Sequence, residues 1–267
     1  PGKTTHLLET ISKQYNAYIV VGIAEKDTSS NLAYNAAALI GPKGYIGKYR
    51  KNGLNMADTK WATRGNLGTP VFETTIGKIA MVICYDDSYL EYLLLPALRG
   101  ADIIAFISAP GQLLENEAGA SYNHSTIANI ASLSGWLGTY IVASSQTGVE
   151  TNASTNQTVY YVGGASIWDP NGHRLAQAKV SNIKNPIPAQ TIMADISTKL
   201  YQNEAKTILE TRRRPALYQI MNLARTYPPC AQEQSKHIEA LLIQYTPIIG
   251  NKTENLKKIA SLIHQQA

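Results

Sequence analysis

The chain has few of the residues that cross-link small domains or bind metals. Only two of its 267 residues are cysteine, Cys84 and Cys230, which is too few for a disulfide framework. Its five histidines are dispersed along the sequence, so their spacing predicts no metal site, and we expect no cofactor. No apolar run is long enough to span a bilayer, and we expect a cytoplasmic location.

The sequence also lacks two motifs that are typical of proteins that bind nucleotides or nucleic acids. The sequence has no glycine-rich phosphate loop and no stripe of alternating basic and aromatic residues. The net charge of +5 comes partly from the run Arg212 to Arg214. We therefore expect no nucleic acid as partner.

Length and periodicity favour a layered α/β protein. A chain of 267 residues that is 44% hydrophobic can bury a large single core. Apolar spacing predicts helices over 6–15, 88–98 and 121–136, strands over 17–24, 78–83, 102–107 and 140–145, and hairpins over 35–49 and 161–180. Strands that alternate with helices indicate sheets covered by helices, not a helical bundle or an all-β sandwich.

Cys84 stands at the end of an apolar run. The segment Gly77 to Ile83 has the composition of a buried strand, and the polar residues Tyr-Asp-Asp follow Cys84 directly. Structural cysteines usually lie inside such a run, whereas a thiol at its polar end can meet a substrate. Alone, this position is weak evidence for a nucleophile, because small buried thiols are common packing residues.

Two other segments accompany this strand. Residues 35–51 form a predicted hairpin around the turn Gly-Pro-Lys-Gly, and its second strand ends in the cationic run Lys48-Tyr-Arg-Lys51. Residues 161–180 contain a Gly-Gly interruption followed by a tight Asp-Pro-Asn-Gly turn. By themselves, the cationic residues are most simply interpreted as a solvated strand end.

Together, these segments resemble the carbon–nitrogen hydrolase (nitrilase) superfamily, and most closely its amidase-like branch. The matching pieces, in chain order, are YNAAALIGPKGYIGKYRKNGL, GTPVFETTIGKIAMVICYDDSYLE, LRGADIIAFISAPG, GGASIWDPNGHRLAQA and RRRPALY. The resemblance runs from about Tyr18 to Tyr218 and implies a four-layer α–β–β–α sandwich. We therefore expect a hydrolase domain over 1–218, a helical extension over 219–267, and assembly as a homodimer or higher homo-oligomer.

The resemblance also implies a mechanism. Members use a glutamate, a lysine and a cysteine, and the cysteine attacks an amide to form a thioester that water hydrolyses. The match places the nucleophile at Cys84 and the lysine at Lys51, with the backbone N–H of Tyr85 as an oxyanion donor. Lys48 is the weaker alternative, because the family's lysine directly follows an aromatic–Arg pair.

An accessory carboxylate often lies between the lysine and the cysteine in this family. Counting back seven residues from Gly65 reaches Asp58, where a glutamate is usual. Aspartate is one methylene shorter than glutamate, so the sequence does not establish whether its carboxylate contacts Lys51 or the substrate. An aspartate that caps a short helix is an equal alternative for this position.

The sequence departs from the family pattern at the general-base glutamate. The strand over 17–24 matches a later strand of the family, so we expect the base to lie outside this chain. We expect Glu9 to be solvated on a helix, and Glu25 to close a strand without a catalytic duty. A second departure is Trp136, which occupies the place of a glutamate in the family's Arg-Ala-x-Glu-Asn run.

Three functions remain open from the sequence. The first is hydrolysis of a small amide or carbamoyl compound, and the second is non-catalytic binding or assembly on the same fold. Transfer of the acyl group to an amine instead of water is the third. The isolated chain lacks activity if the glutamate is indispensable, and the sequence does not name the substrate.

Overall fold

The computed structural model describes residues 2–113, 133–180, 187–222 and 245–265. The chain divides into two compact units, Pro1–Arg214 and Pro215–Ala267. The predicted boundary after Tyr218 stays a prediction. Within the described parts of the chain, no helix is long and apolar enough to cross a membrane.

The first unit contains two sheets that face each other. The smaller is an antiparallel sheet of β1 (Ile19–Lys26), β2 (Ala33–Gly41) and β3 (Gly44–Arg50). The larger sheet has the order β12-β11-β8-β6-β5-β4. Its strands are β4 (Val71–Thr74), β5 (Gly77–Ile83), β6 (Ile103–Ser108), β8 (Tyr140–Ser145), β11 (Ser166–Trp168) and β12 (Arg174–Gln177).

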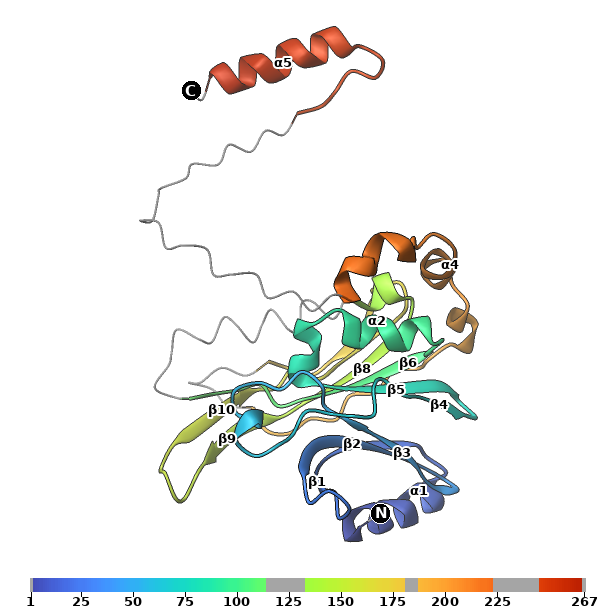
Figure 1. The fold of residues 1–267 in the computed structure, drawn as a ribbon, viewed down its shortest axis with the longest axis vertical. Helices are drawn as coiled ribbons and strands as arrows, with labels where there is room; N and C mark the ends of the chain where they lie inside the picture. The colour runs from blue at the N-terminus through green and yellow to red at the C-terminus, as the bar shows by residue number, and fades with distance from the viewer. Residues whose placement is uncertain (1, 114–132, 181–186, 223–244, 266–267) are drawn as a thin grey trace. The chain divides into compact units, whose positions relative to one another are not determined.

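Helices cover the outer faces of these sheets. Helix α1 (Lys3–Tyr15) packs on β2 and β3, and α2 (Glu91–Leu98) packs on β5 and against α4 (Glu204–Thr211). Figure 1 shows α1 on one side of the paired sheets and α2 with α4 on the other. The predicted four-layer α–β–β–α sandwich is confirmed.

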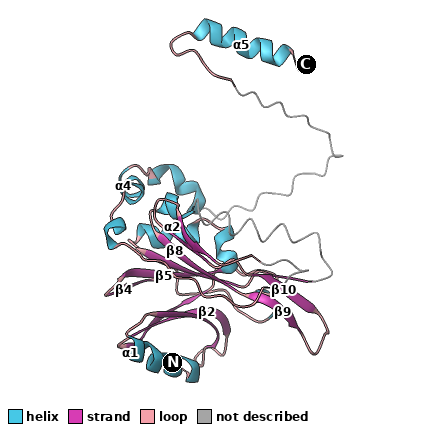
Figure 2. Cartoon of the chain, turned by 180° about the vertical axis from the view of Figure 1, so that it is seen from behind, coloured by secondary structure: helices cyan, strands magenta, loops and turns pink. Residues whose placement is uncertain are grey.

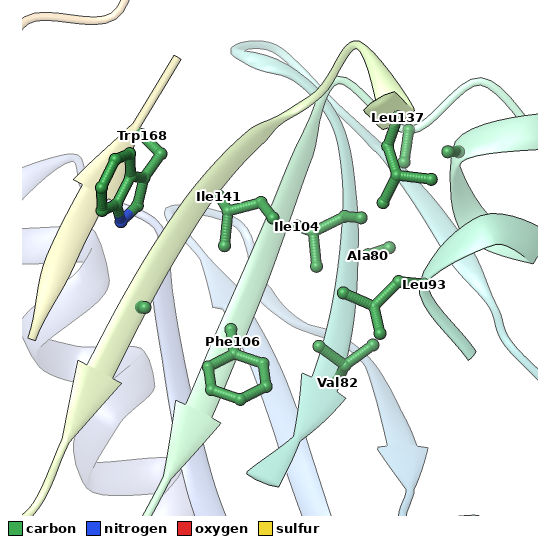
Figure 3. Close-up of a cluster of buried hydrophobic side chains, with 11 residues drawn as sticks. Ala80, Val82, Leu93, Ile104, Phe106, Leu137, Ile141 and Trp168 are labelled. Carbon is green, nitrogen blue, oxygen red and sulfur yellow. The ribbon is translucent and has the colours of Figure 1, made fainter. Parts of the chain in front are cut away.

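Two apolar clusters hold the layers together. One fills the space between the sheets, with Leu39 and Tyr49 from the smaller sheet against Met81 and Ile83 of the larger. The other lies between the larger sheet and its helices, where Ile104 meets other buried side chains (Figure 3). Strands β5, β6 and β8 are buried on both faces, so they are nearly continuous apolar runs, as parallel strands usually are.

The structure departs from two predicted elements. The predicted helix over 88–98 is a 3₁₀ turn, Cys84–Ser88, followed by α2, while residues 121–132 of another predicted helix lie outside the described residues. The segment 161–180 is not one hairpin, because Gly163 and Gly164 adopt φ of 75° and 84° and end the strand before them.

That strand belongs to a third, smaller sheet. It is β10 (Thr158–Val162), which pairs with β9 (Thr147–Thr151) and with β7 (Gly111–Leu113). Figure 2 shows β9 and β10 as strands that extend beyond the larger sheet. The hairpin that follows the two glycines, β11 and β12, instead completes the edge of the larger sheet.

The second unit is described by its own elements alone. It contains a 3₁₀ segment, Pro215–Asn222, and helix α5 (Lys252–His264). The Asn251 side chain accepts a hydrogen bond from the Glu254 N–H and thereby caps the first turn of α5. This helix is amphipathic in sequence.

Candidate active site

Cys84 lies on a sharp turn where β5 ends. Strand β5 is buried, and the 3₁₀ turn Cys84–Ser88 begins at the thiol. Cys84 has a φ of +47°, and the other non-glycine residues with positive φ in the described chain are asparagines. A cysteine in this conformation is strained. Such strain is common at strand-to-helix turns that present a nucleophile, and Cys84 remains partly exposed here.

Lys51 follows directly on β3, in the facing sheet. Its backbone N–H donates to the carbonyl of Asn35 (2.8 Å), which continues the ladder between β2 and β3 by one residue. Its side chain is 1% exposed, and Nζ lies 2.6 Å from Oδ2 of Asp58. A buried ammonium needs such a partner, because an unpaired buried charge is very costly.

Asp58 is bound from three sides. Besides Lys51, its carboxylate accepts hydrogen bonds from Nδ2 of Asn35 (2.9 Å) and from the backbone N–H of Asn55 (3.1 Å). Asp58 is the first residue of the 3₁₀ turn Asp58–Lys60, and the capping position before it is held by Ala57. The helix-cap alternative is therefore wrong, and the shorter side chain of aspartate does reach Lys51.

Gly65 allows the chain to close over this pair. Its N–H donates to the carbonyl of Lys51 (2.8 Å), and a Cβ at this position would lie 2.1 Å from the carbonyl oxygen of Arg50. No side chain fits into that space. The glycine thus gives the backbone at Lys51 a second hydrogen bond, besides the one to Asn35 of β2.

The neighbouring cations and glutamates are engaged elsewhere. Lys48 and Arg50 both bind the carboxylate of Glu25, and Arg50 also contacts Asp27 (3.1 Å). Glu9, expected to be solvated, instead accepts a hydrogen bond from the backbone N–H of Tyr45 (3.0 Å) and so fastens α1 to the hairpin. Lys51 is therefore the lysine of this run that turns toward the cysteine side.

Charges around Cys84 oppose each other. Burial raises the pKa of the Cys84 thiol, while the positive charge of Lys51 and a hydrogen bond from the backbone N–H of Ala109 lower it. The negative charges of Asp87 and Asp58 raise the pKa further. The net effect is a raised pKa of Cys84. Lys51 is the charged group that lowers this pKa and so favours the reactive thiolate near neutral pH.

The charge of Asp87 acts on the Cys84 thiol. Asp87 is the third residue after Cys84 in the same turn. Burial, followed by the charge of Asp86, raises the pKa of Asp87 to about 6, although Lys51 opposes this shift. A half-buried carboxyl that titrates just below neutral pH thus adjoins the thiol.

The structure brings three of the predicted residues together. Lys51, Asp58 and Cys84 lie within electrostatic range of one another, although they come from different sheets and loops. Tyr85 is the second residue of the turn, where an N–H has no acceptor within the turn itself. Cys230 lies outside the described residues.

Ala109, Asp86 and Asp87 also belong to the site, although the sequence did not predict them. Strand β6 runs parallel to β5, and the carboxyl ends of parallel neighbours meet at one edge of a sheet. Because Ala109 follows the end of β6, this rule could have identified it. The two aspartates could have been found as adjacent carboxylates directly after the candidate nucleophile.

The ion pair between Lys51 and Asp58 predicts a pH-dependent stability. Burial raises the pKa of Asp58, but bonds from Lys51, Asn35 and Asn55 outweigh it and hold the pKa below its ordinary value. Such a group stabilises the fold above its unfolded pKa of about 4 and loses this effect as pH falls through its folded pKa. We expect Asp58→Asn to lower the free energy of unfolding by about 2–3 kcal/mol at pH 7, measured by urea denaturation.

This difference should shrink toward zero as the pH is lowered below 4. Glu73→Gln is the matched control, since Glu73 is 78% exposed and pairs with Lys78 only at the surface. A loss from Asp58→Asn that does not change with pH would contradict the assignment of the pair.

The thiol ionisation provides a second prediction. Lys51→Met should raise the pKa of Cys84, and Asp87→Asn should lower it, each by about one unit, because the two charges act on the thiolate with opposite sign. The pH dependence of iodoacetamide alkylation, followed on the Cys84 peptide by mass spectrometry, gives both values. Lys43→Met, in the exposed hairpin turn, should leave the value unchanged. Equal pKa values of Cys84 in the wild type and all three variants would show that neither Lys51 nor Asp87 acts on the thiol through its charge.

Known proteins share this arrangement of elements. A carbon–nitrogen hydrolase structure from Helicobacter pylori G27 superposes with a TM-score of 0.73, at 21% identity, over 84% of this chain and 77% of that one. An amidase of the nitrilase superfamily from Nesterenkonia AN1 matches with a TM-score of 0.60, at 16% identity, over 80% and 71% of the two chains. At these identities the comparison shows the fold.

Sequence relatives cover shorter segments. A nitrilase from Pyrococcus abyssi is 40% identical over 104 residues, or 39% of either chain. A β-ureidopropionase from Arabidopsis thaliana is 36% identical over 135 residues, which is 48% of this chain and 33% of that one. The matched segments thus span about a third to two-fifths of these relatives. The sequence model of carbon–nitrogen hydrolases matches residues 1–205, and the chain belongs to the carbon–nitrogen hydrolase family.

Proposed function

We propose that the protein cleaves a non-peptide C–N bond of a small amide or carbamoyl compound through a thioester on Cys84. One observation carries the proposal: a strained, partly exposed thiol lies in the field of a buried lysine that is held by its own carboxylate. The family membership supports the same reaction class.

Each residue of the site has its own role in the proposed reaction. The Cys84 thiolate attacks the carbonyl carbon, and the new negative charge on oxygen is stabilised by the Lys51 ammonium and the N–H of Tyr85. The C–N bond then breaks, and nitrogen leaves as ammonia or an amine after taking up a proton. Water attacks the thioester, which gives the acid and returns the thiol. Asp58 holds the Lys51 ammonium in place, and the proton that the thiol loses is passed to the leaving nitrogen.

The names of the relatives support the proposed substrate class. A formamidase from Bacillus cereus is 36% identical over 110 residues, or 40% of this chain and 33% of that one. Together with the β-ureidopropionase and the amidase, it favours a small linear amide or ureido compound. We propose a homodimer or higher homo-oligomer as the working form.

The test measures ammonia release from formamide, butyramide and 3-ureidopropionate, with a mass spectrum of the Cys84 peptide during turnover. We expect at least one of these compounds to give ammonia together with an acyl adduct on Cys84. Cys84→Ala and Lys51→Ala should each lower kcat by about a thousandfold or more, since nucleophile and oxyanion stabilisation act as a unit.

Lys48→Ala is the matched control, because that lysine binds Glu25 and should leave turnover nearly unchanged. Full turnover by Cys84→Ala, or the absence of ammonia from all three compounds, would overturn the proposal. A protein that binds the amides without cleaving them would instead favour the binding function.

A further inference from the structure

Asp86 is a fully buried carboxylate next to the nucleophile turn. Its side chain is 0% exposed and accepts hydrogen bonds from donors on both sides of the site. Oδ2 accepts from the backbone N–H of Ile83 (2.9 Å), the residue before Cys84, and from the hydroxyl of Tyr49 (2.8 Å). Oδ1 accepts from the backbone N–H of Gly53 (2.7 Å).

Two of these donors bracket Lys51 along the chain. Tyr49 lies two residues before Lys51, and Gly53 lies two residues after it. The hydroxyl of Tyr49 also accepts from Nδ2 of Asn52 (3.1 Å), the residue next to Lys51. The backbone on either side of the lysine is thus tied to one carboxylate.

The third donor ties the same carboxylate to the thiol. Ile83 ends β5, and its N–H fixes the turn from which Cys84 projects. A Cβ on Gly53 would lie 3.1–3.2 Å from Oδ1 and Cα of Asp86, so the lysine segment approaches the turn closely. The Asp86 carboxylate thus bonds directly to both segments.

We propose that Asp86 is a positioning residue that fixes the Lys51 ammonium relative to the Cys84 thiol. The inference deepens the proposed function and rests on it for its catalytic meaning. Asp86 itself need not touch substrate, because it acts through the backbone on either side of the two residues.

In Asp86→Asn, the loss of the negative charge and the loss of positioning should change the pKa of Cys84 in opposite directions. Removal of a buried negative charge near the thiol would by itself lower the pKa of Cys84. Loss of the bond to Gly53, where an amide NH₂ would face the N–H donor, frees the lysine segment and weakens the effect of Lys51. If positioning dominates, the pKa of Cys84 rises instead.

The experiment is a double-mutant cycle on thiol ionisation. The pH midpoint of iodoacetamide alkylation at Cys84 is measured in the wild type, Asp86→Asn, Lys51→Met and the double variant. We expect Asp86→Asn to raise the midpoint by about one pH unit, which is about a tenfold loss of thiolate at pH 7. In the Lys51→Met background the same substitution should leave the midpoint unchanged or lower it.

Two controls keep the test decisive. Ile104→Val lowers thermal stability within the core and should not move the midpoint, which separates positioning from a general loss of structure. Tyr49→Phe removes one donor and should give a smaller upward shift that also depends on Lys51; it carries the test if Asp86→Asn fails to fold.

The outcomes separate this inference from the proposed function. A midpoint that stays or falls in Asp86→Asn, or that rises equally without Lys51, would overturn the positioning role. Because alkylation needs no substrate, this result is independent of whether any amide is hydrolysed. If the double-mutant cycle gives the expected shifts but no amide is hydrolysed, the result would count against the proposed reaction and would support the positioning role.

Discussion

The buried pair of Lys51 and Asp58 constrains the site more than any other contact. An ammonium with 1% exposure persists in the folded protein only beside a compensating carboxylate, here at 2.6 Å. Asn35 and Asn55 fix that carboxylate in turn, and Gly65 closes the backbone over the lysine. The positive charge therefore stays at one place, just beyond the end of β3.

The thiol is brought to that charge by the topology of the larger sheet. Strands β5 and β6 end at the same edge, so Cys84 and Ala109 come together there. The apolar cluster between the sheets aligns this edge with the end of β3, which delivers Lys51. Burial raises the pKa of the Cys84 thiol. The charge of Lys51 and the backbone N–H of Ala109 act in the opposite direction and lower it.

Local patterns in the sequence predicted much of this arrangement. The strand that ends at Cys84, the hairpin that ends at Lys51 and the α/β layers all follow from apolar periodicity and turn residues. The four-layer sandwich came from the family resemblance, because periodicity does not reveal how sheets face each other. Asp58 was reached through the family resemblance, and only the fold shows that its carboxylate bonds Lys51 instead of capping a turn.

Other features depended on contacts between distant residues. Nothing in the local sequence distinguishes Asp86, which is 0% exposed, from Asp87, which is half-buried beside the thiol. Their different roles arise because Asp86 turns toward Tyr49 and Gly53, which belong to another segment of the chain. The strand β10 was misassigned for a similar reason, since its partners β7 and β9 are set by tertiary pairing.

The central claim is that the Lys51 ammonium and the Cys84 thiol interact directly through their charges. An NMR titration of the Lys51 Cε resonance in selectively ¹³C-labelled protein, assigned by its loss in Lys51→Arg, tests this claim most directly. The account predicts that the resonance shifts with a midpoint equal to the ionisation of Cys84 and that this shift disappears in Cys84→Ser. A Lys51 resonance that stays constant while Cys84 ionises would contradict the account.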